Sequence, residues 1–479
     1  MSFVVSVKCP ECGAPGKHAE GVITFKCQYC ASVLRAQGEG IALKYVIPAR
    51  IKKEDVPLAV KRAVVCGKAA DVSTIRGIFT VCKPFWYFKG MVFFARAGEM
   101  WDDDADKPKE GVPATALVPV ADVVAKTWSH TIPANPTIAP ALFSLGIQPE
   151  ALTLEPYDSE QYAAYRVAPI TASLEDAEKA VVKAALNNVN LDRKKYRYSS
   201  INFIGEKFFI IYYPLTAAVC EGKGGFSTLF FDGVNGNFIE AVPGKDVAAG
   251  LPPDASHYHL QVITHRCPNC GHDLEPGDFN IAFYCRVCFS QWLLEKNQYV
   301  GIAKRTLESQ GGQNTVYVPF WRFDVRLVSR ETGTVCGTVG EFKKLMKAGD
   351  LTLRGQDPAR PLRFYIPALS AKNATVVLKL SARINMAQKD LPVADVNEFS
   401  HPFFYGVTLP QSEAEEMLPV VVFAVIGRHD RAATEFYRSM KVEAQNAELV
   451  WYPFEDKGTM LADRFFQFHL PKRGMTAAI

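Results

Sequence analysis

Large apolar side chains alternate with other residues along several stretches of this chain, and this pattern predicts a β-rich protein. In the stretch 83–94, Trp86, Phe88, Val92 and Phe94 recur with a period of two or its multiples. Because successive side chains of a strand point to opposite faces, these four share one face. We therefore predict a long strand with an aromatic face.

A second stretch, 317–325, repeats the Pro-Phe-Trp sequence and extends the alternation. One face carries Trp321, Phe323, Val325 and Leu327, and the other carries Arg322, Asp324 and Arg326. A face of charged side chains opposite an apolar face predicts a strand that is exposed on one side.

Shorter elements are predicted between and around these two strands. Further strands are expected at 44–50, 207–215, 228–233 and 449–454. Helices are expected at 55–66, 174–187, 341–347 and 429–444. The second helix follows Ser173-Leu174-Glu175-Asp176, whose spacing is typical of a capping box.

Two groups of cysteines share one spacing. They are Cys9, Cys12, Cys27 and Cys30, and Cys267, Cys270, Cys285 and Cys288. In both, 14 residues separate the second cysteine from the third, and the second group follows the first at a constant offset of 258. Paired Cys-x-x-Cys turns around a short hairpin predict a zinc ribbon, with four sulfurs closing a tetrahedral structural site. Two Zn²⁺ are expected, and iron is the alternative metal for four sulfurs.

Two other sequence motifs also occur twice, at offsets close to that of the cysteines. The Pro-Phe-Trp strands lie 235 residues apart, and the Tyr-Pro sequences of 207–215 and 449–454 lie 239 apart. We therefore predict an α+β, β-rich fold of two pseudo-repeated units, each a Cys₄ ribbon followed by an antiparallel-sheet domain. The expected divisions are ribbon 1 at 1–37, α+β domain 1 at 38–250, ribbon 2 at 251–296 and α+β domain 2 at 297–479.

Composition and charge describe an ordinary globular chain. The 479 residues are 48% hydrophobic and 22% charged, with no apolar run of bilayer-spanning length and no signal-peptide pattern at the start. A cytoplasmic location is expected. Eight thiolates and two Zn²⁺ would bring the formal charge of +4 to zero, so there is no global attraction to nucleic acid or to an anionic membrane.

Cysteines, aspartates and histidines outside the two clusters are interpreted as structural or surface residues. Cys66, Cys82, Cys220 and Cys336 are scattered among apolar or small residues and are interpreted as buried free thiols. The Asp-rich stretch 101–108 lacks the glycine and terminal glutamate of a calcium loop and is interpreted as a solvated loop. His18 is interpreted as a surface residue, and His257, His259 and His265 show no metal-ligand spacing.

No catalytic motif is found. The chain lacks a phosphate-binding loop, a nucleophile elbow, a His-Glu-x-x-His motif and a dinucleotide fingerprint. A cysteine-based enzyme would need a thiol beside a histidine, and sequence alone places none of the free cysteines against one. We therefore expect a protein that is not an enzyme.

The combination of motifs resembles a group of bacterial proteins with transcription-factor-IIB-type zinc ribbons. The resemblance rests on both ribbons, Pro84-Phe85-Trp86, Pro319-Phe320-Trp321, Tyr213-Pro214 and the turn Asp232-Gly233-Val234-Asn235-Gly236. Those proteins are often encoded beside SPFH-domain proteins and relatives of phage-shock protein A. The resemblance implies a recruiter or scaffold in membrane-stress or membrane-remodelling machinery, with such proteins as partners at the inner membrane. This chain differs from many relatives in having two ribbon units and no predicted transmembrane helix.

Two functions are compatible with these features. A zinc-ribbon scaffold or adaptor that binds proteins accounts for the closed metal sites, the many aromatics and the absence of catalytic motifs. The alternative is nucleic-acid binding, for which Lys8, Lys17, Lys26 and Arg35 around the first ribbon would supply positive charge. The same cations would also offset the charge of a zinc–thiolate centre, so the scaffold is the favoured interpretation.

Overall fold

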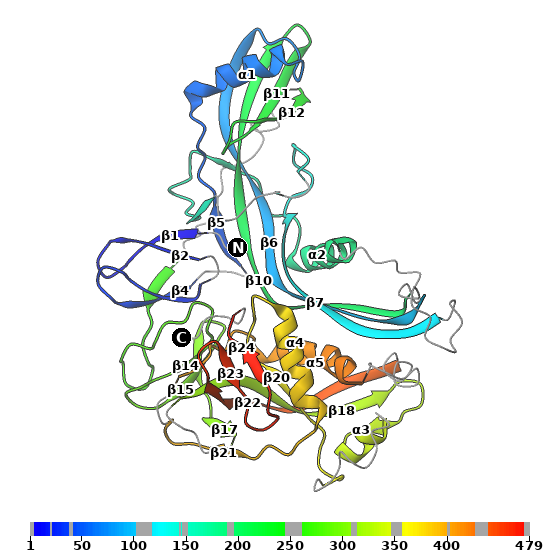
Figure 1. The fold of residues 1–479 in the computed structure, drawn as a ribbon. Coiled ribbons are helices and arrows are strands. Elements are labelled where there is room, and N and C mark those ends of the chain that lie inside the picture. Colours follow the sequence, from blue (N-terminus) through cyan, green and yellow to red (C-terminus); the bar gives the residue numbers. More distant parts are fainter. Residues whose placement is uncertain are drawn as a thin grey trace.

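The computed structural model describes residues 4–19, 22–37, 42–101, 117–142, 145, 152–188, 196–244, 261–307, 314–345, 357–399, 403–426 and 439–473. Two large β-sheets, of ten and eight strands, dominate these residues, together with five α-helices and two three-stranded sheets (Figure 1). The prediction of a β-rich protein with few helices is confirmed.

Two very long strands form the centre of the first sheet. Strand β6 (Thr74–Trp101) runs antiparallel to β10 (Tyr196–Gly222), and β7 (Leu117–Pro133) pairs with the other edge of β6. The predicted strands 83–94 and 207–215 lie wholly within β6 and β10. Aromatic and β-branched residues along both segments favour an extended chain of this kind.

Both faces of β6 are buried at the Pro-Phe-Trp segment, although one apolar face was predicted. Trp86 and Phe88 pack beneath α2 (Leu174–Asn188) in one cluster. Phe85 and Tyr87 belong to a different cluster on the opposite face. Because the sheet is covered on both sides here, aromatic residues at consecutive positions are all buried.

One end of the long strands projects as an arm in Figure 1. The tip of the arm carries α1 (Val56–Val65), which a short 3-10 turn, η1 (Lys53–Asp55), precedes in the chain. Strands β11 (Gly225–Asp232) and β12 (Phe238–Pro243) lie at the same tip. The apolar stripe of α1 packs on β11, which confirms the predicted helix at 55–66. The capping box before α2 is also found, since the Asp176 amide donates to Ser173 Oγ at 3.1 Å.

The second large sheet is centred on β18 (Thr315–Ser329) and β22 (Met440–Asp456), which run antiparallel. Its remaining strands are β17 (Arg305–Leu307), β19 (Val335–Cys336), β20 (Arg363–Pro367), β21 (Val393–Asp395), β23 (Met460–Ala462) and β24 (His469–Pro471). The predicted apolar face of β18 is buried, whereas Arg322, Asp324 and Arg326 remain partly or fully exposed. The one-sided strand is therefore confirmed.

The helices of the second half differ from the prediction. The helix expected at 429–444 is wrong over 440–444, which belong to β22 and pair with β18, whereas 429–438 lie outside the described residues. Helix α3 (Val339–Leu345) lies close to the predicted 341–347. Two helices were missed, α4 (Ala374–Met386) and α5 (Gln411–Ile426). They lie between the two large sheets in Figure 1 and share one hydrophobic core with residues of both.

The two halves have the same strand order around their long strands. In the first, β5 (Leu43–Val46) runs parallel to β10, which is antiparallel to β6. In the second, β17 runs parallel to β22, which is antiparallel to β18. Pro84 lies opposite Tyr212, and Pro319 lies opposite Trp451.

The last two cysteines of each cluster lie in the turn of a small three-stranded sheet, and these two sheets contact each other. The first includes β3 (Thr24–Lys26) and β4 (Val33–Gln37), and the second comprises β14 (Ala282–Tyr284), β15 (Gln291–Glu295) and β16 (Gln298–Gly301). Strand β13 (Gln261–Thr264), which precedes the second cluster, pairs with β4 and so completes the sheet of the first ribbon. Two segments far apart in sequence therefore build one ribbon.

Three other short strands attach the first ribbon to the first large sheet. They are β1 (Val4–Lys8), β2 (Pro15–Ala19) and β8 (Thr153–Pro156), and a fourth, β9 (Arg166–Val167), pairs with β6. Strand β1 pairs with both β2 and β8. Within the described ranges, no helix combines the length and the apolar character needed to cross a bilayer.

Candidate metal centres

Two tight turns present the cysteines of the first cluster. The Gly13 amide donates to the Cys9 carbonyl at 2.8 Å, and the Ala31 amide donates to the Cys27 carbonyl at 3.0 Å. Gly13 and Ala31 have φ values of 72° and 61°. This left-handed conformation lets each turn reverse immediately after its second cysteine.

The second cluster has the same construction. The amides of Gly271 and Phe289 donate to the carbonyls of Cys267 and Cys285, both at 2.9 Å. Their φ values are 74° and 60°. A phenylalanine is unfavourable at positive φ, so the turn at Phe289 is held by its surroundings.

The structure brings the eight predicted ligands together as two groups of four. Within each group all sulfur atoms lie within 4.8 Å of one another. The shortest Sγ–Sγ distances are 3.7 Å for Cys9–Cys30 and Cys12–Cys27, 3.6 Å for Cys267–Cys288 and 3.5 Å for Cys270–Cys285. Zinc–sulfur bonds of about 2.3 Å place tetrahedral ligands about 3.8 Å apart. All the cysteines are free thiols, so both groups could hold a metal ion.

A metal held by four thiolates would cross-link the two turns of each ribbon and leave no coordination position for a substrate. The donor set alone suits zinc or iron. The arrangement therefore supports structural sites rather than Lewis-acid catalysis at an open position.

Two serines beside the sulfurs were not predicted. Ser32 Oγ lies 3.3 Å from Cys30 Sγ, and Ser290 Oγ lies 3.0 Å from Cys288 Sγ. Trp292 Nε1 donates to Ser290 Oγ at 2.8 Å, which leaves the serine proton free to point at sulfur. Both serines stand two residues after the last cysteine of their cluster, at the same offset of 258, and this repeated position could have revealed them.

The serines favour the thiolate form of the neighbouring cysteines. Hydrogen bonding by Ser32 lowers the pKa of Cys30 to about 6. Burial opposes ionisation of Cys288, but hydrogen bonds from Ser290 and Asn269 lower its pKa to about 5. Since a thiolate is the form that binds metal, both contacts prepare the clusters for a cation.

The remaining cysteines lie apart from the clusters. Burial raises the pKa of Cys82, and it raises those of Cys220 and Cys336 to about 11 and 12. These three fit the predicted buried thiols. Cys66 is exposed instead, because it follows α1 beyond the last buried residue of that helix, Ala63.

Among the histidine side chains that the structure describes, none joins either cysteine group. His265 is fully buried, where burial and then the charge of Arg35 lower its pKa to about 3, and its Nδ1 is hydrogen-bonded to the Tyr299 hydroxyl. The side chain of His18 and the residues His257 and His259 lie outside the described parts, as does the Asp-rich loop after Trp101. Among described side chains, no third group of ligands gathers closely enough for a metal.

Arg35 connects the two ribbons. It was predicted among the surface cations of the first ribbon, but it is 5% exposed and its guanidinium stands over the Tyr299 ring at 4.9 Å. The Ile23 amide also donates to the Asp278 carbonyl at 2.7 Å. The metal clusters therefore belong to ribbons that are packed together.

Comparison with protein-family models, curated proteins and solved structures finds no match to this chain.

Proposed function

We propose that this protein is a non-enzymatic scaffold whose two zinc ribbons each present an apolar tip to a protein partner. The observation that carries the proposal is the exposure of Tyr29 and Val287, at 69% and 51%. Each stands between the last two cysteines of its cluster, and they are related by the offset of 258. A single exposed apolar side chain is ordinary, so the support comes from its recurrence at the same position of both ribbons, each on a turn closed by a backbone hydrogen bond.

Zinc is the proposed metal in both centres, with iron as the alternative. It would act by holding the turns that carry Tyr29 and Val287. Because a structural zinc site contributes directly to folding free energy, loss of metal would release both tips together with the turns that support them. The scaffold would therefore bind its partner only when it is loaded.

We further propose that the halves are copies of one unit, which would give the scaffold two related docking faces. Corresponding hydrogen bonds support this. Trp86 Nε1 donates to the Ala172 carbonyl at 3.1 Å, and Trp321 Nε1 donates to the Leu409 carbonyl at 2.9 Å. Each carbonyl lies two residues before a helix, α2 in the first case and α5 in the second.

A protein partner is favoured over nucleic acid. Burial removes Arg35 from the positive surface that the nucleic-acid alternative requires, and a fully loaded chain carries no net charge. By the resemblance described above, SPFH-domain proteins or relatives of phage-shock protein A are candidate partners. Such a partner would bring the protein to the periphery of the inner membrane.

Site-specific photo-cross-linking tests the proposal. A photoreactive amino acid is placed at Tyr29, Val287 or the control position Val335, which is 38% exposed but lies outside the ribbons. Cross-links to one protein from positions 29 and 287, lost after chelation and not formed from 335, are expected. Equal labelling from 335, or recovery of nucleic acid in place of protein, would overturn the scaffold. Filter binding with a salt titration checks the nucleic-acid result independently.

A further inference from the structure

A charged cleft of about 430 Å³ opens on the second large sheet. Three arginines from three different strands line it, Arg305 of β17, Arg322 of β18 and Arg363 of β20. Glu448 of β22 lies among them, and Asp390 and Asp395 also line the cleft. We call this site the arginine cleft.

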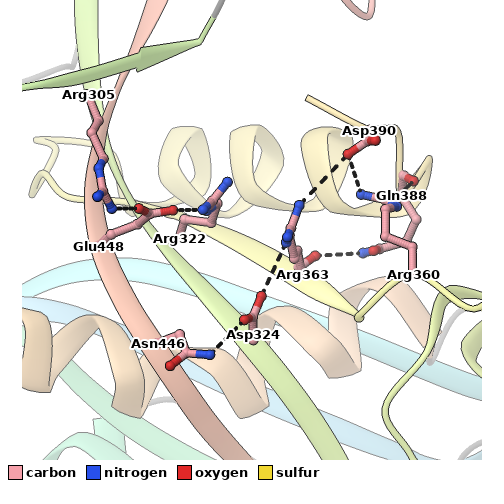
Figure 2. Close-up of polar contacts among 9 residues, drawn as sticks. All are labelled: Arg305, Arg322, Asp324, Arg360, Arg363, Gln388, Asp390, Asn446 and Glu448. Carbon is pink, nitrogen blue, oxygen red and sulfur yellow. Dashed lines mark hydrogen bonds and ion pairs between the residues drawn. The ribbon is translucent and has the colours of Figure 1, made fainter. Parts of the chain in front are cut away.

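Ion pairs hold the arginines in place on the floor of the cleft. Figure 2 shows Glu448 between Arg305 and Arg322, with an ion pair to each. Arg363 Nε lies 3.2 Å from Asp324 Oδ1, and Asn446 donates to the other oxygen of that carboxylate at 3.0 Å. The inner guanidiniums are therefore oriented before any ligand arrives.

The two remaining carboxylates are much more exposed. The side chains of Asp390 and Asp395 are 65% and 77% exposed, against 12% for Glu448. Asp395 pairs with Arg305 at 3.0 Å, and Asp390 lies 3.8 Å from Arg363. Exposed pairs of this kind contribute at most about 1 kcal/mol to stability, so a competing anion can displace them at little cost.

The same positions of the first large sheet form an apolar core. Counting along the strands from the paired prolines, the matching residues are Tyr45 with Arg305, Tyr87 with Arg322 and Phe209 with Glu448. Tyr87 and Phe209 stack at 4.7 Å and are buried beneath β1 and β8. The second sheet therefore carries a charged network where the first carries a packed aromatic core, and its guanidiniums line a cleft instead of being covered.

We infer that the arginine cleft binds a phosphate monoester of a small molecule. With Asp390 and Asp395 turned away, the guanidiniums of Arg305, Arg322 and Arg363 face the cleft, and Glu448 is the carboxylate that remains between two of them. A phosphate monoester dianion would replace the two aspartate carboxylates as the partner of these guanidiniums, with one negative charge for each carboxylate displaced. Guanidinium groups bind phosphate oxygens through two parallel hydrogen bonds, and three strands supply them from different directions.

Calorimetry on the full-length, metal-loaded protein tests the inference, with glycerol 3-phosphate and inorganic phosphate as probes and sulfate as the anion control. The Asp390→Asn, Asp395→Asn double variant is expected to bind glycerol 3-phosphate about tenfold more tightly, because the competing carboxylates are gone. Arg363→Gln and Arg305→Gln should each weaken binding about tenfold. Arg76→Gln, which breaks an exposed pair with Glu221 at the arm, is the matched control and should change nothing.

Circular dichroism establishes that each variant is folded, and Arg305→Gln, whose side chain is the most exposed of the cleft arginines, serves if Arg363→Gln unfolds. Binding of glycerol 3-phosphate in preference to sulfate supports a phosphate monoester. Equal binding of inorganic phosphate would assign the site to free phosphate and overturn the monoester. No binding by the wild type, or weaker binding by the double aspartate variant, would show that the network is only structural.

Discussion

Thr24 and Gly277 join the two ribbons through a reciprocal pair of hydrogen bonds. Thr24 Oγ1 donates to the Gly277 carbonyl at 3.0 Å and accepts from the Gly277 amide at 2.9 Å. Thr24 is fully buried. A single side chain therefore satisfies both backbone groups of a residue in the other ribbon, which couples the stability of the two metal centres.

Replacing Thr24 by valine should destabilise the protein by about 1–3 kcal/mol, because it leaves the half-buried Gly277 amide unpaired and removes one of the two hydrogen bonds to the Gly277 carbonyl, the other coming from the Asn280 amide. Chemical denaturation of the zinc-loaded protein measures the loss. Thr334→Val is the control, since Thr334 is exposed, and should cost less than about 0.5 kcal/mol. Equal stability of wild type and Thr24→Val would show that the ribbon contact contributes nothing.

Metal analysis should find two metal ions per wild-type chain. Cys27→Ser and Cys285→Ser should each reduce this to one, because a site that loses one of four ligands loses its closed shell. Cys66→Ser, the exposed cysteine outside both clusters, should retain two. Elemental analysis distinguishes zinc from iron, and one metal or none in the wild type contradicts the paired centres.

Ser290→Ala should weaken metal binding at the second centre about tenfold or more, the usual effect of removing a group that hydrogen-bonds a metal ligand. Ser32→Ala should have a smaller effect at the first, because no tryptophan orients Ser32, whereas Trp292 fixes Ser290. Competition with a chromogenic chelator measures both affinities. Ser73→Ala, on the arm, is the control, and equal affinities in all three variants would exclude a role for the serines.

The contribution that two carboxyls at the contact between the halves make to stability should fall as the pH rises from about 4.5 to 7. Burial raises the pKa values of Glu206 and Glu413 to about 7, and Glu178 and Glu416 raise that of Glu206 further. A carboxyl whose pKa is raised in the folded state is protonated there at pH values where the unfolded chain is ionised. The contribution of these two carboxyls to the free energy of unfolding therefore decreases as they ionise in the folded state.

The Glu206→Gln, Glu413→Gln double variant isolates this contribution. Metal binding weakens at low pH because thiolates become protonated, so the informative quantity is the difference in unfolding free energy between variant and wild type at each pH. The variant should gain relative stability from pH 5 to pH 8. Glu175→Gln, on the exposed surface of α2, should show the same pH dependence of the unfolding free energy as the wild type. Parallel pH profiles for all three proteins would contradict the prediction.

Local patterns were sufficient for elements whose faces differ in polarity. The alternation in β18 and the stripe in α1 are properties of neighbouring residues, so they predict the elements before any partner is known. Helix α5 was not predicted because it packs between two sheets and is apolar nearly all round, so it lacks the alternation of apolar and polar faces that marks a helix. The last part of the helix predicted at 429–444 was wrong because pairing with β18, far away in sequence, holds 440–444 as a strand.

The two groups of metal ligands could be predicted from the chain alone, since the reach of a Cys-x-x-Cys turn depends only on adjacent residues. The folded structure was needed to establish that β13 completes the first ribbon, that Arg35 is buried against Tyr299, and that charged residues of β17, β18, β20 and β22 lie close together. Such contacts join residues up to hundreds of positions apart. Their spacing along the chain carries no signal, because packing of the whole fold brings them together.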